Sequence, residues 1–338
     1  MARTAIILMN LGGPDSLDAV EPFLFNLFKD PAIIRLPAPL RLPLAWLVAR
    51  RRTGTAREIY ARLGGASPLL ANTEAQARAL EAALGDRHRC FVAMRYWHPT
   101  SSEAARAVAK WGPDEIVSLP LYPQFSTTTT ASSLADWRRA AAQQGLNRST
   151  RSVCCYPAES GFVDAVAELI RPELATANSH GKAARLLLTA HGLPKRIVQA
   201  GDPYPSQVEM TALAVVEKLA QPGLDWQVCY QSRVGPLEWI GPATDAEIRR
   251  AGSEGVPLVV APISFVSEHS ETLVELDIDY RDLAERSGVP AYHRVATVGT
   301  APGFIAALAN LVCGACSTSG LTACSAFDRA CATAGGRG

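Results

Sequence analysis

Eight short apolar runs, separated by helix-like segments, constrain the fold of this chain more than any other feature. Four lie in the first half and four in the second, at residues 4–12, 89–96, 115–123, 152–157, 185–192, 226–233, 257–265 and 293–299. The runs are continuously apolar rather than alternating, which is typical of parallel strands covered on both faces. The segments between them have helical spacing, as in 72–85, 101–112 and 203–220, and we expect the first of these to begin at the Asn72–Thr73 cap. The sequence therefore predicts an α/β fold with two parallel four-stranded sheets.

The repeated pattern also predicts the domain organisation. At 338 residues the chain is long enough for two domains, and the pattern breaks near residues 157–185. We predict an N-terminal domain over 1–157, a C-terminal domain over 158–311 and a cysteine-rich tail over 312–338. In such sheets, functional groups gather beyond the carboxyl ends of the strands.

Composition excludes several classes of protein. A net charge of +1 argues against nucleic acid as a general partner. No run approaches eighteen apolar residues, so no spanning helix is expected. Gly12 and Gly13 follow the first apolar run, but neither a GxGxxG nor a Walker motif is present, so we expect no nucleotide. The N-terminus enters the first run without a signal-peptide cleavage site, which predicts a cytoplasmic protein.

The alternation of strand-like and helix-like segments is interrupted over residues 30–55. This segment combines four prolines, many large apolar residues and three consecutive arginines at 50–52. One interpretation is a helical hairpin packed on its domain. The other is an exposed apolar lip, residues 35–52, whose basic rim touches a lipid surface or a large apolar ligand.

Two polar features follow apolar runs in the second half. His191 ends the run 185–192 before a Gly-Leu-Pro turn, where it is either structural or a titrating group. If a helix begins near Ser267, four carboxylates share one of its faces: Glu268, Glu271, Glu275 and Asp279. This row is either a solvated acidic face or the wall of a cleft. In a cleft, mutual repulsion would raise carboxyl pKa values, and the row could relay protons or hold a hydrated divalent cation.

The eight cysteines fall into two groups. Cys90, Cys154, Cys155 and Cys229 lie in apolar runs and are expected to be buried thiols. The other four lie within the last 26 residues, at Cys313, Cys316, Cys324 and Cys331. A cytosolic cluster of this kind indicates metal binding before it indicates disulfides.

Seven motifs of this chain resemble ferrochelatase. They are LMNLGGPDS, ARRRTGTAREIYARLGGASPL, MRYWHP, LYPQFSTTTTASSL, LTAHGLP, YQSRVGPLEWIGPATD and SEHSETLVELDIDY. They occur in the order and spacing of that family, and the resemblance covers residues 4 to about 311. The resemblance implies two similar Rossmann-like domains with an active-site cleft between them. It also implies an enzyme that inserts Fe²⁺ into protoporphyrin IX, the last step of protoporphyrin-dependent haem synthesis.

The resemblance also implies roles for single residues. His191 matches the active-site histidine, which would accept pyrrole protons or deliver metal, and Glu271 matches its partner carboxylate with Glu275 behind it. The same three side chains would meet the Fe²⁺ substrate. Porphyrin contacts are implied for Leu11, Arg51, Arg52, Tyr60, Ser67, Arg95, Tyr122, Ser126 and Trp239.

The cysteine-rich tail resembles the subgroup of ferrochelatases that carry a 2Fe–2S cluster. The implied ligands are Cys313, Cys316, Cys324 and Cys331. In well-known members one ligand comes from the chain interior, so Cys154 or Cys155 is the alternative to Cys331. Four thiolates also suit zinc, so a zinc site at the same cysteines is a second alternative.

Three rival functions remain to be weighed. A porphyrin or haem carrier would need neither His191 nor Glu271 as a proton acceptor. A cobalt chelatase for a corrin precursor shares the architecture, but the motifs RRRTGTAREIYARLGGASP and SEHSETLVELD favour haem synthesis. A coproporphyrin ferrochelatase keeps the chemistry, but the apolar lip and Leu11 favour protoporphyrin. The lip also predicts peripheral membrane association.

Overall fold

The computed structural model describes residues 2–146, 150–233, 235, 237–317 and 322–323. They form two compact units. The first comprises the chain up to Leu121 together with Ser126–Cys154 and Leu308–Ala323. The second comprises Tyr122–Phe125 and Cys155–Ala307. Each unit is built around its own parallel sheet, as the two series of apolar runs predict.

The sheet of the first unit has the strand order β2-β1-β3-β4-β9. Its strands are β1 (Thr4–Asn10), β2 (His88–Met94), β3 (Glu115–Pro120), β4 (Thr150–Val153) and β9 (Thr322–Ala323), and all pairings are parallel. Every residue of the central strand β1 is buried. This explains why its sequence is continuously apolar: helices cover both of its faces.

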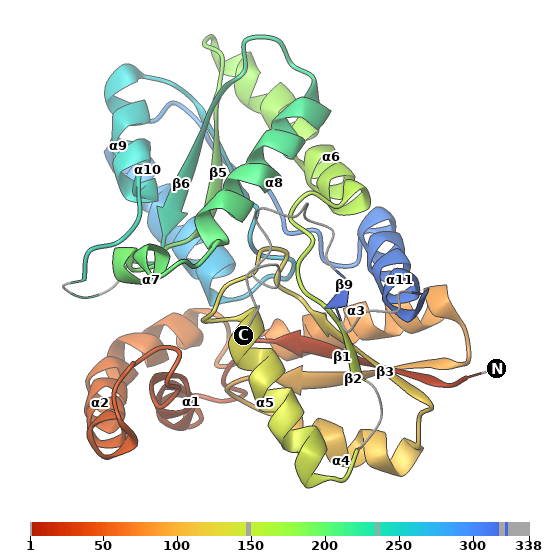
Figure 1. Cartoon of the computed structure of the whole chain (residues 1–338). Coiled ribbons are helices and arrows are strands. Elements are labelled where there is room, and N and C mark those ends of the chain that lie inside the picture. The colour runs from red at the N-terminus through yellow and green to blue at the C-terminus, as the bar shows by residue number, and fades with distance from the viewer. Residues whose placement is uncertain (1, 147–149, 234, 236, 318–321, 324–338) are drawn as a thin grey trace. The chain divides into compact units, whose positions relative to one another are not determined.

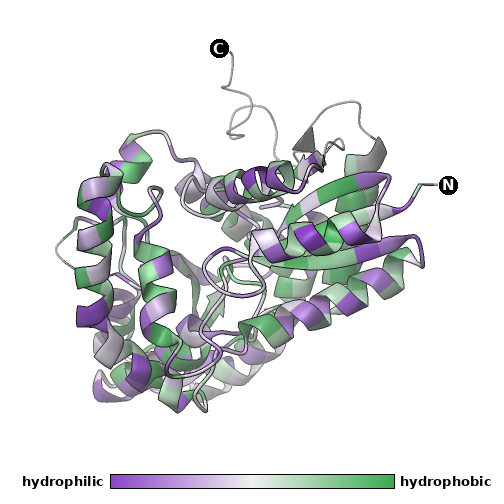
Figure 2. Ribbon diagram, turned by 90° about the horizontal axis from the view of Figure 1, so that it is seen from below, coloured by the Kyte–Doolittle hydropathy of each residue, from purple (hydrophilic) through white to green (hydrophobic). Residues whose placement is uncertain are grey.

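Three helices pack on this sheet: α3 (Leu69–Leu84), α4 (Ser101–Trp111) and α5 (Thr130–Gln143). Helices α4 and α5 cover one face, where the fully buried Trp137 packs with Phe91 and Ile116, and α3 lies on the other (Figure 1). In Figure 2 the strands near the N-terminus are green, whereas the flanking helices alternate purple and green. The helices are therefore amphipathic, with one side in the core and one side in water.

Two further helices of the first unit, α1 (Val20–Phe28) and α2 (Ala38–Arg62), form a pair. Val20, Phe23 and Leu24 of α1 pack against Ala49 and Tyr60 of α2. The hairpin expected for residues 30–55 is confirmed in this respect. Helix α2 nevertheless leaves several large apolar side chains exposed.

The sheet of the second unit has the order β6-β5-β7-β8. Its parallel strands are β5 (Arg185–His191), β6 (Asp225–Gln231), β7 (Leu258–Pro262) and β8 (Tyr292–Arg294). The helices of this unit are α6 (Ser160–Ala177), α7 (Lys195–Gln199), α8 (Tyr204–Leu219), α9 (Thr244–Glu254) and α10 (Tyr280–Arg286), with a 3₁₀ turn at Asn178–His180. Helix α11 (Pro302–Ser317) belongs to this unit up to Ala307 and to the first unit from Leu308. One core joins β5 and β7 to α9 and α10 through Leu187, Val260, Ile248 and Ala284.

All eight predicted strands and the two parallel sheets are confirmed. The two-residue strand β9 is an addition that was not predicted. The cap expected at Asn72 and Thr73 is wrong, because α3 begins at Leu69, three residues earlier. The Thr73 hydroxyl instead donates to the carbonyl of Leu69 and accepts from Asn10. A threonine that bonds back to the preceding turn can lie inside a helix.

Candidate active site

His191 is the last residue of β5, at the carboxyl end of the second sheet. Its backbone N–H donates to the Ser264 hydroxyl at 3.2 Å, and its ring Nδ1 lies 2.6 Å from the carbonyl oxygen of Gly192. A bond to a carbonyl requires Nδ1 to be the donor, which leaves Nε2 of the neutral ring as a proton acceptor. The side chain is 41% exposed, so Nε2 can be reached by a ligand.

Glu271 lies opposite this nitrogen. Its Oε2 is 3.8 Å from Nε2 of His191 and 3.9 Å from Nε2 of His269, a largely buried histidine whose Nδ1 contacts the carbonyl of Ser267. Glu271 begins the helix η2 (Glu271–Asp279), which has π-helical rather than α-helical hydrogen bonding. Long π-helical stretches are rare and occur often at functional sites.

Glu275 lies one turn further along η2 and is held from several sides. Its carboxylate accepts from the Ser232 backbone N–H at 2.8 Å, the Ser232 hydroxyl, the Gln231 amide at 3.1 Å and the Tyr280 hydroxyl at 3.0 Å. Burial and the neighbouring charge of Glu271 raise the pKa of Glu275, although the hydrogen bonds of Ser232 oppose this shift. A raised pKa lets a carboxyl group hold a proton at a higher pH than an ordinary glutamate does, which suits proton exchange.

Ser232 joins the two carboxylates. Its hydroxyl is 3.3 Å from Glu271 Oε2 and 2.5 Å from Glu275 Oε2. Its backbone φ is +58°, in the left-handed region that residues other than glycine seldom adopt. Strained conformations of this kind cluster at functional sites, where the surrounding contacts maintain them.

The raised pKa of Glu275 predicts a pH dependence of stability. The folded protein binds this proton more tightly than the unfolded chain, whose glutamate has a pKa near 4.5. As pH rises from that value through the raised pKa, the wild type should therefore lose stability relative to Glu275→Gln, which cannot ionise. Urea unfolding of both proteins at pH 5 and pH 8 checks this expectation. If the free energies of unfolding of the two proteins differed by the same amount at both pH values, the expectation would be contradicted.

Trp239 packs beside the histidine through a glycine. A Cβ on Gly192 would lie 3.2 Å from Cε3 of Trp239 and 2.9 Å from the carbonyl oxygen of Gln231. Only glycine therefore allows the indole ring to lie against the backbone that follows His191. The structure thus brings His191, Glu271, Glu275 and Trp239 together in the second unit.

Glu268 departs from the predicted acidic row. The expected helix from Ser267 with four carboxylates on one face is wrong, because η2 begins only at Glu271. Glu268 precedes it, and its Oε1 accepts from the Arg294 guanidinium at 2.6 Å and from the Thr297 N–H at 2.8 Å. Burial acts to raise the pKa of Glu268, but a hydrogen bond with Thr272, the charge of Arg294 and the bond from Thr297 lower it, so this carboxylate serves as an ion-pair partner.

In the first unit, Arg95 belongs to a buried polar cluster. Its guanidinium donates to Asp30 at 2.6 Å and to the Ser132 hydroxyl at 2.7 Å. Asp30 also accepts from the Tyr96 hydroxyl at 2.8 Å. The Arg95 side chain is 16% exposed, and its role toward a porphyrin stays a prediction.

The other predicted porphyrin contacts lie in different surroundings. Leu11 and Tyr60 pack in the α1–α2 core, and Gly13 lies so close to Ser67 that a Cβ at that glycine would overlap the Ser67 hydroxyl. Ser126 is buried and bonds to Thr128. Arg51 and Arg52 are exposed on α2, and Tyr122 is half-buried in the second unit. Their contact with a porphyrin also stays a prediction.

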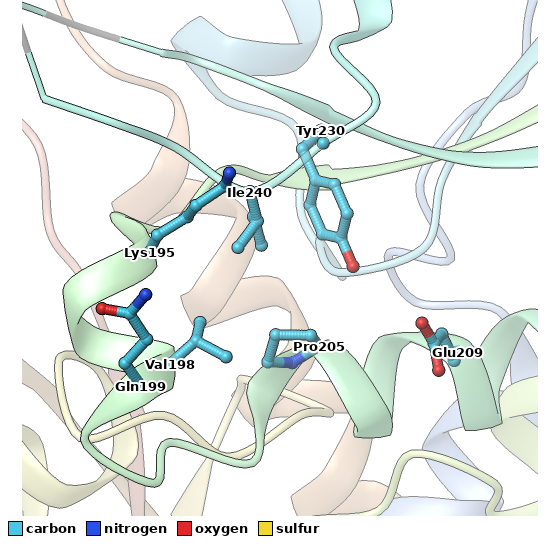
Figure 3. Close-up of a pocket in the computed structure, with 8 residues that line it drawn as sticks. Lys195, Val198, Gln199, Pro205, Glu209, Tyr230 and Ile240 are labelled. Carbon is cyan, nitrogen blue, oxygen red and sulfur yellow. The ribbon is translucent and has the colours of Figure 1, made fainter.

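A separate pocket of about 370 Å³ lies in the second unit beside α7 and α8. Figure 3 shows Lys195, Val198, Pro205 and Tyr230 around it, with the Tyr230 hydroxyl pointing toward Glu209. None of its lining residues is among the predicted site residues. Within the described residues, no three His, Cys, Asp or Glu side chains converge as a preformed metal-ion site.

Sequence reasoning did not single out Gln231, Ser232, Ser264, Tyr204 or Tyr280. Gln231 is the last residue of β6 and Ser232 follows it, at the same edge of the sheet as His191, so the rule that parallel strands end at one edge could have found them. No sequence signal distinguishes Ser264, whose hydroxyl meets both the His191 backbone and buried Tyr204.

Comparison with known proteins places the chain in a family. A sequence model described as Ferrochelatase matches residues 3–315. A protein named Ferrochelatase from Caulobacter vibrioides (strain NA1000 / CB15N) is 56% identical over 315 residues, which cover 92% of this chain and 89% of that protein. One from Wolbachia sp. subsp. Drosophila simulans is 49% identical, covering 91% of this chain and 98% of that protein.

Solved structures support the fold alone, at low identity. SirB from Bacillus subtilis with Fe³⁺ has a TM-score of 0.55 and 12% identity, covering 93% of this chain and 96% of that chain. Sirohydrochlorin chelatase SirB from Bacillus subtilis subspecies spizizenii in complex with cobalt has a TM-score of 0.53 and 12% identity, covering 93% and 95%. Because the family model spans nearly the whole chain and relatives exceed 40% identity, this chain belongs to the ferrochelatase family and is an enzyme, a metal chelatase.

Proposed function

We propose that this enzyme inserts Fe²⁺ into protoporphyrin IX to form protohaem, the terminal step of haem biosynthesis. Metal insertion into a porphyrin in haem biosynthesis follows from the family. The observation that carries the proposed chemistry is the pair formed by His191 and Glu271, which the Ser232 hydroxyl links to Glu275. Free-base porphyrin must lose two N–H protons, and these groups supply acceptors at one place.

In this proposal the imidazole of His191 and the carboxylates of Glu271 and Glu275 have different roles. His191 Nε2 accepts a pyrrole proton, because the bond of Nδ1 to Gly192 leaves Nε2 as the acceptor. Glu271 and Glu275 carry the proton away or strip water from the incoming Fe²⁺ substrate. We propose that Trp239 packs on the macrocycle and favours a bent ring, which exposes its nitrogens to the metal.

We propose porphyrin contacts also for the residues of the first unit and for Tyr122. Basic side chains, Arg51 and Arg52 on α2 and Arg95, suit the two propionates. Leu11, Tyr60, Ser67, Tyr122 and Ser126 supply apolar or short polar contacts. Leu11 and the apolar α2 favour protoporphyrin, because coproporphyrin carries propionates where protoporphyrin has apolar vinyl groups.

An anaerobic insertion assay tests the proposal. The purified enzyme is mixed with Fe²⁺ and either protoporphyrin IX or coproporphyrin III, and the metallated product is followed by visible absorption. We expect a higher kcat/KM for protoporphyrin. A preference for coproporphyrin would change the substrate, and tight porphyrin binding without turnover would instead indicate a carrier.

We further propose that this enzyme is cytoplasmic and attaches reversibly to membranes through the apolar lip, residues 35–52. Leu40, Leu44 and Leu47 lie at helical spacing on α2, and Leu40 is 62% exposed and Trp46 50% exposed. The Arg50 guanidinium lies 5.0 Å from the Trp46 ring centre. Apolar side chains beside cations suit an anionic lipid surface. No helix among the described residues has the length and apolarity needed to cross a bilayer.

Liposome flotation tests the lip. We expect the enzyme to float with vesicles that contain anionic lipid, and the double variant Leu44→Ser/Trp46→Ser to lose most of this binding. Leu213→Ser is a matched control, because Leu213 is 51% exposed on α8 of the second unit. Each basic residue near the membrane surface should contribute about 1 kcal/mol to the binding free energy. Because salt screens this attraction, a high salt concentration should reduce the fraction of enzyme that floats with the vesicles. Equal recovery with and without vesicles would contradict the proposal.

We also propose a 2Fe–2S cluster in the C-terminal tail. The exposed thiol of Cys313, near the end of α11, can serve as a ligand. The side chain of Cys316 and all of Cys324 and Cys331 lie outside the described residues. Four thiolates match the donor set of such a cluster. The structure also supports the interior alternative: β9 pairs with β4 so that Ala323 lies opposite Val153, and Cys154 follows Val153 in the chain.

Iron and acid-labile sulfide analysis after anaerobic purification tests the cluster. We expect two irons and two sulfides per chain. Cys313→Ser should bleach the protein, whereas Cys90→Ser, at a thiol of the first sheet, should not. Comparing Cys331→Ser with Cys154→Ser identifies the fourth ligand. Stoichiometric zinc without sulfide would overturn the cluster.

A further inference from the structure

Strand β8 holds the π-helix η2 through two side chains. The Tyr292 hydroxyl donates to the carbonyl oxygen of Leu276 at 2.8 Å. The Arg294 guanidinium binds both carboxylate oxygens of Asp277, through Nε at 2.9 Å and Nη2 at 2.5 Å. Tyr292 and Arg294 are two residues apart on one strand and therefore point to the same side of the sheet.

The same guanidinium also binds the segment before η2. Nη1 of Arg294 donates to Glu268 Oε1 at 2.6 Å. Glu268 lies three residues before Glu271, and Asp277 lies two residues after Glu275. One side chain, only 10% exposed, thus bridges the chain on both sides of the two carboxylates assigned to proton transfer.

A π-helical stretch needs such support. Its hydrogen bonds run from residue i to i+5, and isolated sequences prefer the α-helix. Three carbonyls of η2 accept from side chains outside it: Glu271 from Gln231, Leu276 from Tyr292, and Asp277 from Arg281 of α10. Partners outside the helix therefore stabilise the wide turn.

The helix type decides where Glu275 points relative to Glu271. In an α-helix of 3.6 residues per turn, residues four apart pass one full turn. In the wider π-helix the same spacing falls short of a full turn. A change from one type to the other would swing Glu275 around the helix axis, away from Ser232 and Tyr280.

We infer that Arg294 and Tyr292 are positioning residues for metal insertion: they hold η2 in its π form and thereby keep Glu271 and Glu275 directed at one site. This inference rests on the proposed function. Neither residue contacts the predicted catalytic side chains, so both act through Asp277 and Leu276. The effect should therefore fall on kcat rather than on porphyrin KM.

Arg294→Lys is the principal test. Lysine keeps the charge but cannot bind a carboxylate with a two-pronged fork. We expect kcat for Fe²⁺ insertion to fall about 10- to 100-fold, as for supporting contacts around other metal sites, with porphyrin KM changed by less than about threefold.

Arg185→Lys is the matched control. Arg185, at the start of β5, is 7% exposed and also binds two carboxylates, Asp225 and Glu254, each at 2.8 Å. It lies at the opposite end of the strand from His191. We expect this variant to lose comparable thermal stability while retaining kcat.

Two further variants keep the inference testable if Arg294→Lys does not fold. Tyr292→Phe removes a single hydroxyl and should lower kcat about three- to tenfold. Asp277→Asn should lower kcat in the same direction as Arg294→Lys, and the double variant should be no worse than Arg294→Lys, which already breaks the Asp277 contact.

The outcomes separate the inference from the function. An inactive wild type would overturn the proposed function. An active wild type with unchanged kcat in folded Arg294→Lys, or in both Tyr292→Phe and Asp277→Asn, would overturn the inference alone. Equal loss of kcat in Arg185→Lys would also overturn it, because general destabilisation would then explain the effect.

Discussion

Replacing His191 by alanine should abolish Fe²⁺ insertion while porphyrin still binds. The variant removes Nε2, the proposed proton acceptor, which lies 3.8 Å from Glu271, but keeps Trp239 and the apolar surroundings. General acid–base groups contribute about 10²- to 10⁴-fold to rates, and loss of the acceptor should bring turnover to the detection limit. Insertion rate and porphyrin fluorescence quenching, measured on the same preparation, separate catalysis from binding.

His88→Ala is a matched control for that experiment. The ring Nδ1 of His88 also contacts a backbone carbonyl, that of Leu84 at 3.0 Å, but His88 begins β2 in the first unit. We expect this variant to keep normal turnover. Near-normal turnover in His191→Ala would refute the assignment of His191 as the acceptor.

Glu271→Gln should lower kcat by at least about 100-fold, and Glu275→Gln by less. Glu271 lies next to two histidines, whereas Glu275 lies one turn further along η2 and is bound by Ser232 and Tyr280. Glutamine keeps the size of the side chain but cannot accept a proton. The rate of Fe²⁺ insertion in a single turnover, measured for both variants, shows which substitution lowers the rate more. If Glu275→Gln were the more damaging change, the direction of proton flow along η2 would be reversed.

Most of the fold could be predicted from the sequence because parallel strands buried on both faces leave a strong signal. The run 257–265, which contains β7, has Ser264 as its one polar residue, and the run 185–192, which contains β5, has three consecutive leucines at its centre. Helix starts were harder to predict. At α3, a threonine that looks like a cap lies inside the helix, because its hydroxyl bonds to the preceding turn and to Asn10.

The candidate site was predictable in part. His191 and Glu271 are marked by their motifs, and the structure brings them together. The π-helix was not predictable, because spacing arguments assume 3.6 residues per turn, and the contacts that widen η2 come from β6, β8 and α10. Glu268 was misplaced for the same reason: its partner Arg294 is 26 residues away in the chain.

The lip shows how two interpretations of one segment can both hold. Ala45, Ala49 and Tyr60 form the side of α2 that packs on its unit, which satisfies the hairpin prediction. Leu40, Leu44 and Leu47 follow another side and remain exposed. The sequence contains one apolar segment. Which side of helix α2 is buried depends on the residues that pack against it, and these cannot be identified from the segment alone.

The two-residue strand β9 has a consequence for anyone who shortens this chain. It covers the outer side of β4, pairing with Ser152 and Val153, and β4 would otherwise be the last strand of its sheet. A chain that stops after α11 leaves the N–H and C=O groups of that side open to strands of other molecules. Removing the tail would therefore expose β4 as an edge strand with unpaired backbone groups. The shortened enzyme would be prone to self-association through this edge, whether or not the tail holds metal.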